Sequence, residues 1–140
     1  MLHHSRVLVV DDEPLIRELV ADALREVGFE IQCAANGVEA FDVLRGWLPS
    51  VIVLDLMMPQ LDGLGFCEML RLNPRLAKIP VLLVTAGYSP QAAAERMGAS
   101  AILTKPFELD HLVEMVENLV GTATPAADSR SESSLVRDSR

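Results

Sequence analysis

The sequence predicts a single α/β domain in which a parallel sheet is covered by helices on both faces. Short apolar runs alternate with amphipathic stretches as far as residue 120, which is typical of repeated strand-helix units. The runs are almost continuously apolar, as strands buried on both faces are. A length of 140 residues suits one domain, and 50% hydrophobic residues exclude a disordered chain.

Five apolar runs are the predicted strands, and each is followed by a predicted helix. The strands span residues 6–10, 30–34, 50–54, 80–84 and 101–103. The first helix ends at Gly28, and its apolar face at helical spacing consists of Leu15, Ile16, Leu19, Val20, Ala23, Leu24 and Val27. Asn36 and Glu39 resemble a capping box and open the second helix, which extends to about Arg45.

The remaining helices are predicted from their caps and periodicity. Asp62 caps a helix over residues 63–72, and Ser89-Pro90 begins a fourth helix that ends at Gly98. The last helix has an apolar face of Leu109, Leu112, Val113, Val116 and Leu119. Residues 121–140 lose this periodicity and are rich in Ser, Ala, Asp and Arg. We therefore expect a folded domain over residues 1–120 and a disordered C-terminal tail after it.

The acidic excess lies in the part that is expected to fold. The chain has 12 Lys and Arg against 20 Asp and Glu, which gives a net charge of −8. Residues 121–140 carry 3 of each sign, so residues 1–120 carry the whole excess, 9 against 17. A domain this acidic lacks the positive surface that binds a phosphate backbone. We therefore expect no direct contact with nucleic acid.

The cysteines and the apolar stretches predict a cytoplasmic protein. Cys33 and Cys67 lie in apolar surroundings without a CxxC spacing, which favours reduced, buried thiols over a disulfide or a zinc site. Residues 1–5 hold no long apolar run, and the longest uncharged stretch, residues 79–94, is interrupted by two prolines. We therefore expect neither a signal peptide nor a membrane segment.

Polar residues gather where the predicted strands end. In an open α/β sheet, ligands bind beyond the carboxyl ends of the strands, where the strand order reverses. The polar residues after the first, third, fourth and fifth strands are Asp11, Asp12, Glu13, Asp55, Thr85, Thr104 and Lys105. The second strand ends in Ala34-Ala35. If the strand order is 2-1-3-4-5, the strands with polar ends are neighbours and these side chains converge.

The convergence predicts a cation site. Carboxylates at Asp11, Asp12 and Asp55 would repel one another in one cleft unless a cation were present. Carboxylate oxygens are hard ligands, and the pattern offers no His or Cys, so the expected ion is Mg²⁺. Lys105 would supply a second positive group. Singly, Asp12 could be a turn residue or helix cap and Lys105 a surface residue, but the joint pattern favours a site.

Four motifs resemble those of a known family. They are VLVVDDEP at residues 7–14, DLMMPQLDG at 55–63, VTA at 84–86 and TKPF at 104–107. In this order and at these separations, they make residues 5–120 similar to the receiver domain of two-component response regulators, in particular single-domain, chemotaxis-regulator-like ones. The resemblance implies a flavodoxin-like, doubly wound (βα)5 fold with a five-stranded parallel sheet in the order 2-1-3-4-5.

The resemblance also implies the chemistry of the site. Asp55 would be the phosphoacceptor, a carboxylate nucleophile that forms an aspartyl-phosphate. Asp12, Asp55 and the backbone carbonyl of Met57 would hold Mg²⁺, and Asp11 would reach the ion directly or through water. The ion would neutralise charge on the transferring phosphoryl group.

The remaining motif residues have implied roles around that centre. Lys105 would pair with a phosphoryl oxygen once the acceptor is modified, and Thr85 would donate its hydroxyl to another. Pro59 and Gly63 would shape the loop after the acceptor strand. The bond between Lys105 and Pro106 would be a cis peptide, which only an X-Pro bond adopts readily.

The sequence departs from the family pattern where the site would signal to the surface. Ile102 occupies the position of the family's switch aromatic, and its β-branched side chain has a stiff χ1 and no ring to swing inward. Thr85 and Lys105 are 20 residues apart, which is short for the family and predicts a truncated fourth helix. We expect the loop of residues 86–90, with Gly87 as its flexible residue, to carry most of the change. In the alternative, Ile102 packs under the fourth helix and takes no part in signalling.

The expected function is that of a phosphorylation-dependent signalling module that catalyses only its own phosphorylation and dephosphorylation. A sensor histidine kinase or a phosphotransfer protein would supply the phosphoryl group, and an output protein would bind the altered surface. A phosphorylation-dependent dimer is a further expectation. Two alternatives stay open: a receiver fragment of a larger transcriptional regulator, and an Asp-nucleophile phosphatase. The phosphatase is disfavoured because Met57 stands where its general acid is needed.

Overall fold

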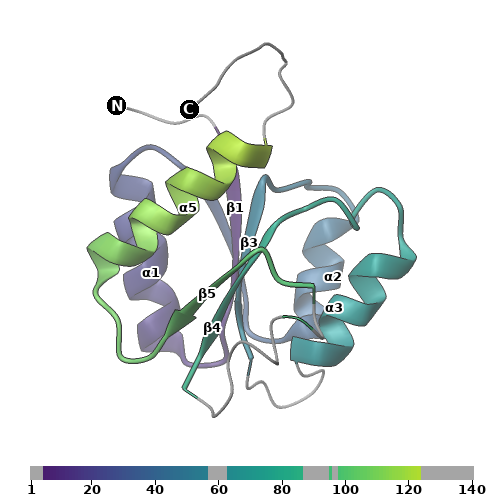
Figure 1. The fold of residues 1–140 in the computed structure, drawn as a ribbon, viewed down its shortest axis with the longest axis horizontal. Coiled ribbons are helices and arrows are strands. Elements are labelled where there is room, and N and C mark those ends of the chain that lie inside the picture. The colour runs from purple at the N-terminus through teal and green to yellow at the C-terminus, as the bar shows by residue number, and fades with distance from the viewer. Residues whose placement is uncertain (1–4, 57–62, 87–94, 96–97, 124–140) are drawn as a thin grey trace.

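A single parallel sheet forms the centre of the molecule. The computed structural model describes residues 5–56, 63–86, 95 and 98–123 of the 140-residue chain. The strands are β1 (Arg6–Val10), β2 (Glu30–Ala34), β3 (Val51–Asp55), β4 (Val81–Thr85) and β5 (Ala101–Thr104). They are ordered β2-β1-β3-β4-β5, and every neighbouring pair is parallel (Figure 1). The predicted fold class and strand order are confirmed.

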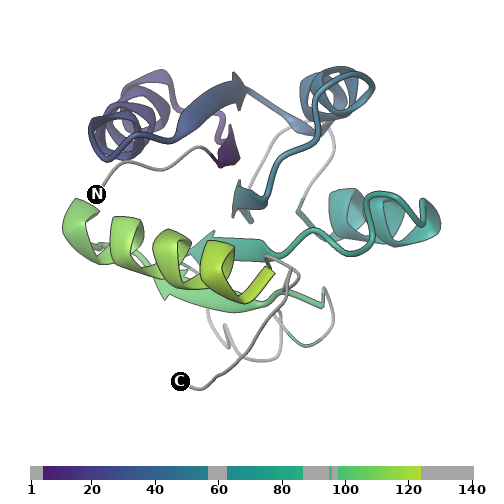
Figure 2. The same cartoon turned by 90° about the horizontal axis from the view of Figure 1, so that it is seen from above.

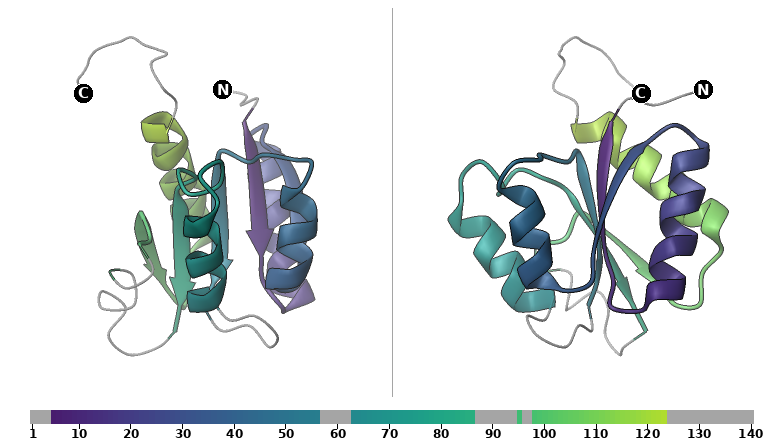
Figure 3. Two further views of the ribbon diagram at one scale, coloured as in Figure 1. Left: turned by 90° about the vertical axis from the view of Figure 1, so that its right-hand side faces the viewer. Right: turned by 180° about the vertical axis from the view of Figure 1, so that it is seen from behind.

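The described helices form a layer on each face of the sheet. They are α1 (Pro14–Glu26), α2 (Gly37–Leu44), α3 (Gly63–Leu72) and α5 (Leu109–Ala123). In Figure 1, α1 and α5 cover one face while α2 and α3 cover the other, and the views from above and from behind agree (Figures 2 and 3). The sheet is therefore the middle layer of three, as the continuous apolar runs predict.

Each face of the sheet has its own hydrophobic core, because successive strand residues point to opposite faces. On the side of α2 and α3, buried residues include Leu8, Val10, Ile52, Leu54, Phe66 and Leu83. On the side of α1 and α5, they include Val7, Val9, Val53, Leu82, Val84 and Leu112. Alternate residues of one strand thus serve both cores, and this fixes the register of the sheet.

The strands β3 and β4 end one residue later than the sequence predicts. Asp55 pairs with Val84, and Thr85 pairs with Thr104, so both polar residues belong to the ladder itself. The ladder holds their backbones more firmly than a loop would, since neighbouring strands bond on both sides of β3 and β4.

The exposed face of α1 corrects one prediction. Leu15 and Leu19 were expected in the apolar face that packs on the sheet, but they are 71% and 44% exposed. The buried residues of the helix are Val20, Ala21 and Leu24. Consecutive helix residues are about 100° apart, so the row of Leu15 and Leu19 lies one step around from the row that meets the sheet.

The helix ends follow their predicted caps where the structure describes them. Asn36 accepts a hydrogen bond from the Glu39 N–H at 2.9 Å, while Glu39 accepts one from the Ala35 N–H at 2.8 Å. Gly28 and Gly98 have positive φ angles of 100° and 69°, which suits a glycine that ends a helix. The start of the predicted fourth helix, Ser89-Pro90, lies outside the described residues.

The last helix ends later than expected, and both cysteines are free thiols. The helix α5 continues to Ala123, so residues 121–123 are helical and the predicted boundary at residue 120 is three residues early. Cys33 and Cys67 are free thiols, and burial raises the pKa of Cys67 to about 11. Among the described residues, no helix combines the length and apolar character that a bilayer crossing requires.

Removing the ring of Phe66 tests the core beneath α3. Phe66 is fully buried, with its ring centroid 4.9 Å from that of Phe41. We expect Phe66→Ala to lower the free energy of unfolding by about 3–5 kcal/mol, because it leaves a cavity. Leu72→Ala on the same helix, at a residue that is 84% exposed, should cost about 0.5 kcal/mol or less. Urea unfolding followed by circular dichroism measures both. Equal losses would contradict the assigned faces of α3.

Candidate functional site

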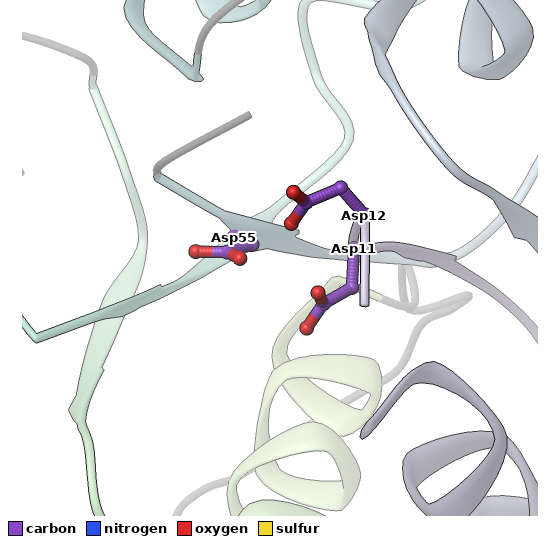
Figure 4. Close-up of side chains that lie close together, drawn as sticks. All are labelled: Asp11, Asp12 and Asp55. Carbon is purple, nitrogen blue, oxygen red and sulfur yellow. The ribbon is translucent and has the colours of Figure 1, made fainter. Parts of the chain in front are cut away.

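Three carboxylates meet at the carboxyl edge of the sheet. Asp11 and Asp12 follow β1 directly, and Asp55 is the last residue of β3. Because β1 and β3 are neighbours paired at Val10 and Leu54, the side chains of all three lie together (Figure 4). One carboxylate oxygen from each lies within 4.8 Å of the others. The structure thus brings together three residues that the sequence predicts for one site.

The three carboxylates differ in their exposure to water. Asp11 and Asp55 are 6% and 5% exposed, whereas Asp12 is on the surface. Like charges at this distance repel, and burial weakens the screening that water would provide. The cluster therefore favours any positive group that can approach it.

Lys105 is one such group. Its Nζ lies 3.5 Å from Oδ2 of Asp55. The lysine follows β5, and its backbone N–H donates to the carbonyl of Thr85 at 2.8 Å, which continues the β4–β5 pairing by one residue. Thr85 is only 1% exposed. The predicted acceptor, lysine and hydroxyl residues are thus placed by three adjacent strands, β3, β4 and β5.

The turn from β1 to α1 is held by its own hydrogen bonds. The Asp11 N–H donates to the carbonyl of Ala34 at 3.1 Å, and Oδ1 of Asp11 accepts from the Glu13 N–H at 2.9 Å. Nη1 of Arg17 donates to the carbonyl of Asp11 at 2.9 Å. Arg17 is not among the site residues predicted from the sequence. A basic residue in the first turns of a helix that follows an acidic strand end is the signal that could have found it.

The donor set fits a hard divalent cation. Asp11, Asp12 and Asp55 offer only oxygen ligands, and within the described chain no His or Cys joins the group. Oxygen ligands of this kind suit Mg²⁺, which commonly takes a few carboxylates and keeps several waters. The carbonyl of Met57, expected as a further ligand, lies outside the described residues.

The other predicted site residues are placed in part. Gly63 is the first residue of α3. Pro106 follows a cis peptide bond with Lys105, as the resemblance implies. Ile102 is half-buried in β5 and packs against the core on the side of α2 and α3. The structure leaves two predicted residues, Pro59 and Gly87, outside its described ranges.

An apolar groove of about 450 Å³ is bordered by Lys105, the lysine that contacts Asp55. It separates α1 from the segment that joins β5 to α5. Its lining includes Ile16, Leu19 and Val20 from α1 with Pro106, Phe107 and Leu109 opposite, and also Glu13 and Lys105. Leu19 is exposed because it forms a wall of this groove.

Comparison with known proteins agrees with the geometry. The sequence model of the response regulator receiver domain matches residues 7–117. The chain belongs to this family. The match includes all five strands except the first residue of β1, and it includes the site residues Asp11, Asp12, Asp55, Thr85 and Lys105. The family description is that of a receiver domain and not of an Asp-nucleophile phosphatase.

The relatives of this receiver domain include longer proteins. Response regulator Rre1 of Synechocystis sp. is 38% identical over 135 residues, which cover 94% of this chain and 58% of that protein. In the same organism, the DNA-binding dual master transcriptional regulator RpaA is 37% identical over 117 residues, covering 82% of this chain and 48% of that protein. The chain therefore spans about half the length of these relatives.

One solved relative contains a magnesium ion. The response regulator TrrA from Thermotoga maritima was solved in complex with Mg²⁺ and BeF, and it superposes on this chain with a TM-score of 0.73. The sequences are 35% identical, and the match covers 82% of this chain and 98% of that one.

Lys105→Met tests how far the receiver domain depends on the ion pair at its site. The substitution leaves the buried Asp55 among like charges, so we expect the free energy of unfolding to fall by about 1–2 kcal/mol, a value reduced for the partial exposure of the lysine. Arg45→Met is the control, since Arg45 and Asp42 form an exposed pair at 3.6 Å. The free energy of unfolding of Arg45→Met should fall by about 0.5 kcal/mol or less. Urea unfolding in metal-free buffer measures both, and equal losses would contradict the role of Lys105.

Proposed function

We propose that this receiver domain is a signalling module that accepts a phosphoryl group on Asp55. The observation that carries the proposal is the cluster of three carboxylates beside Lys105, at the edge of the sheet where ligands bind in such folds. Phosphoryl transfer depends mostly on positioning and on stabilising charge, and a rigid strand end with adjacent positive groups supplies both.

The chemistry follows from the residues in place. An oxygen of Asp55 attacks phosphorus in line with the leaving group, and the bond from phosphorus to the donor breaks with its electron pair going to the donor. Lys105, now 3.5 Å from Oδ2 of Asp55, moves to a phosphoryl oxygen, and Thr85 donates its hydroxyl to another. Attack by water on the same phosphorus breaks the bond to the Asp55 oxygen, whose electron pair returns to the carboxylate, and releases inorganic phosphate. The protein in this proposal catalyses no reaction on other substrates.

Asp11, Asp12, Asp55 and the carbonyl of Met57 are the proposed ligands of Mg²⁺. When bound, the ion supplies positive charge that offsets repulsion among the carboxylates and the phosphoryl oxygens. The complex of TrrA with Mg²⁺ and BeF supports this assignment for a relative that is 35% identical. The oxygen-only donor set of this chain supports it independently.

The proposed donor is a sensor histidine kinase or a phosphotransfer protein. Such a donor must bring a phosphorylated side chain to Asp55, so its surface must cover the structure around the site. The groove beside Lys105 offers apolar surface for that contact, and Leu19 in its lining is 44% exposed. Exposed apolar side chains that cluster beside a polar site commonly mark an interface.

A second candidate is the receiver part of a longer transcriptional regulator. RpaA, which is named as a DNA-binding regulator, shares 37% identity with this chain over 117 residues. In that case a separate DNA-binding domain carries the output, since this acidic chain of net charge −8 is unsuited to bind DNA itself. The length of the native reading frame distinguishes the two candidates.

Labelling with acetyl phosphate tests the acceptor and its dependence on metal. With Mg²⁺ present, we expect an acid-stable, base-labile acyl phosphate on the wild type and none on Asp55→Asn, because the amide is no nucleophile for phosphorus. The exposed carboxylate of Asp42 provides the control, and Asp42→Asn should label as the wild type does. EDTA should abolish labelling. Undiminished labelling of Asp55→Asn, or of the wild type in EDTA, would refute the proposal.

Hydrogen exchange tests which segment of the domain changes when Asp55 is modified. Beryllofluoride mimics the phosphoryl group on Asp55, and we expect it to change protection mainly within residues 85–98, which include the proposed loop hinge Gly87. Ile102 has no ring to swing and packs against the core, so residues 100–107 should change less. Protection changes confined to residues 100–107 would show that β5 carries the signal instead.

A further inference from the structure

One residue of α1, Arg17, is hydrogen-bonded to both ends of the turn that holds two of the three carboxylates. The backbone N–H of Arg17 donates to the carbonyl of Glu13 at 2.9 Å. Its Nη1 donates to the carbonyl of Asp11, also at 2.9 Å. Asp12 lies between the two acceptor residues. The bond to Glu13 is the first ordinary backbone bond of α1, so the guanidinium bond to Asp11 is what the arginine side chain adds: it ties the start of the Asp11–Asp12–Glu13 turn to the helix.

The turn depends on this contact because the helix start lacks an ordinary cap. Glu13 is the N-cap residue, and its side chain makes no capping hydrogen bond with α1. Pro14 follows at the first helical position and has no N–H to donate. The carboxylate of Asp11 accepts from the Glu13 N–H at 2.9 Å, so its orientation depends on where Glu13 lies. The guanidinium of Arg17 adds a second link, from the Asp11 carbonyl to the helix that begins after Glu13.

The bond from Arg17 is of a strong kind. A guanidinium donates to the Asp11 carbonyl at a distance typical of charge-assisted hydrogen bonds, which are roughly twice as strong as neutral ones. Arg17 and Asp11 are both partly or fully buried, and this limits competition from water. A loop that is ordered before its ligand arrives binds it more tightly, since less conformational freedom is lost on binding.

The guanidinium also carries a positive charge next to a cation site. As a charge, Arg17 repels an incoming cation, and removing it should strengthen cation binding. As a clamp, Arg17 orders the ligand turn, and removing it should weaken cation binding. The two effects have opposite signs, so experiment can separate them. They also differ in their response to salt, which screens the charge but not the short hydrogen bond.

We propose that Arg17 is a positioning residue that holds the Asp11–Asp12 turn in the arrangement that binds a divalent cation. In this proposal, the hydrogen bond from Arg17 strengthens cation binding more than the positive charge of Arg17 weakens it. The inference rests on the proposed function, in which this turn holds Mg²⁺. It adds a residue that makes no contact with the phosphoryl group and acts only through the backbone of Asp11.

Mg²⁺ binding to the full chain tests the inference, with Arg17→Met and Arg17→Lys as variants. Arg25→Met is the matched control, because Arg25 lies on the same helix, exposed, and pairs with Asp22 at 3.2 Å. Titration calorimetry at low and high salt gives the dissociation constant for Mg²⁺. Thermal unfolding without Mg²⁺ measures stability, and acetyl phosphate labelling is followed as a function of Mg²⁺ concentration.

We expect Arg17→Met to raise the dissociation constant for Mg²⁺ about tenfold, the loss of one charge-assisted hydrogen bond. Arg17→Lys, which keeps the charge and one donor group, should fall between it and the wild type. Arg25→Met should stay within about twofold of the wild type. Saturating Mg²⁺ should restore labelling of Arg17→Met, which a merely misfolded variant would not show.

Binding of Mg²⁺ to Arg17→Met as tight as to the wild type, or tighter, would overturn the inference, because the guanidinium would then act only as a charge. Labelling that saturating Mg²⁺ fails to restore would overturn it too. Should Arg17→Met not fold, Arg17→Lys decides: weaker binding at an unchanged unfolding temperature supports the clamp, and unchanged binding refutes it. A wild type that labels on Asp55 without binding Mg²⁺ would refute the proposed metal site itself.

Discussion

The register between β1 and β3 is the constraint on which the rest of the site depends. Pairing of Val10 with Leu54 sets the ends of the two strands side by side, and the residues that follow or end them are Asp11, Asp12 and Asp55. Their oxygens come within 4.8 Å of one another, and two of the three carboxylates are almost fully buried. Repulsion among buried carboxylates lowers the free energy of unfolding. The hydrophobic cores on the two faces of the sheet fix both strands and offset that loss.

The cores hold this arrangement because every residue of β1 after Arg6, and every residue of β3, is buried. A slip of one residue in either strand would turn its apolar side chains to the opposite faces and separate the carboxylates at the same time. The register that packs Leu54 beneath α2 and α3 is therefore the register that places Asp55 beside Asp11. Hydrophobic packing far from the site thus sets which strand ends lie side by side within it.

Much of the fold and part of the site could be predicted from the sequence, because they depend on local patterns. Apolar runs gave the strands to within one residue, and polar residues at the strand ends gave Asp11, Asp12, Asp55 and Lys105 as neighbours once the order 2-1-3-4-5 was adopted. Exposure of Leu15 and Leu19 could not be predicted, because periodicity gives a helix face but not how much of it the sheet covers. The bond from Arg17 was missed for a related reason: a bond from a long side chain to a carbonyl six residues earlier leaves no periodic signal, and only the place of a basic residue soon after the acidic strand end indicates it.

Two cationic side chains at the site, Arg17 and Lys105, contact different parts of it. The part proposed to bind the cation is therefore held separately from the part proposed to respond to phosphorylation. Arg17 contacts the backbone of Asp11, a group whose charge does not change when Asp55 is modified. Lys105 contacts the carboxylate of Asp55, the group that changes in the proposed reaction. A modified Asp55 must therefore exchange its contact with Lys105, while the turn of β1 can keep its geometry. The backbone N–H of Lys105 is bonded to the carbonyl of Thr85. On these contacts the proposed response starts at Thr85, at the end of β4, on the opposite side of Asp55 from the turn proposed to hold the metal.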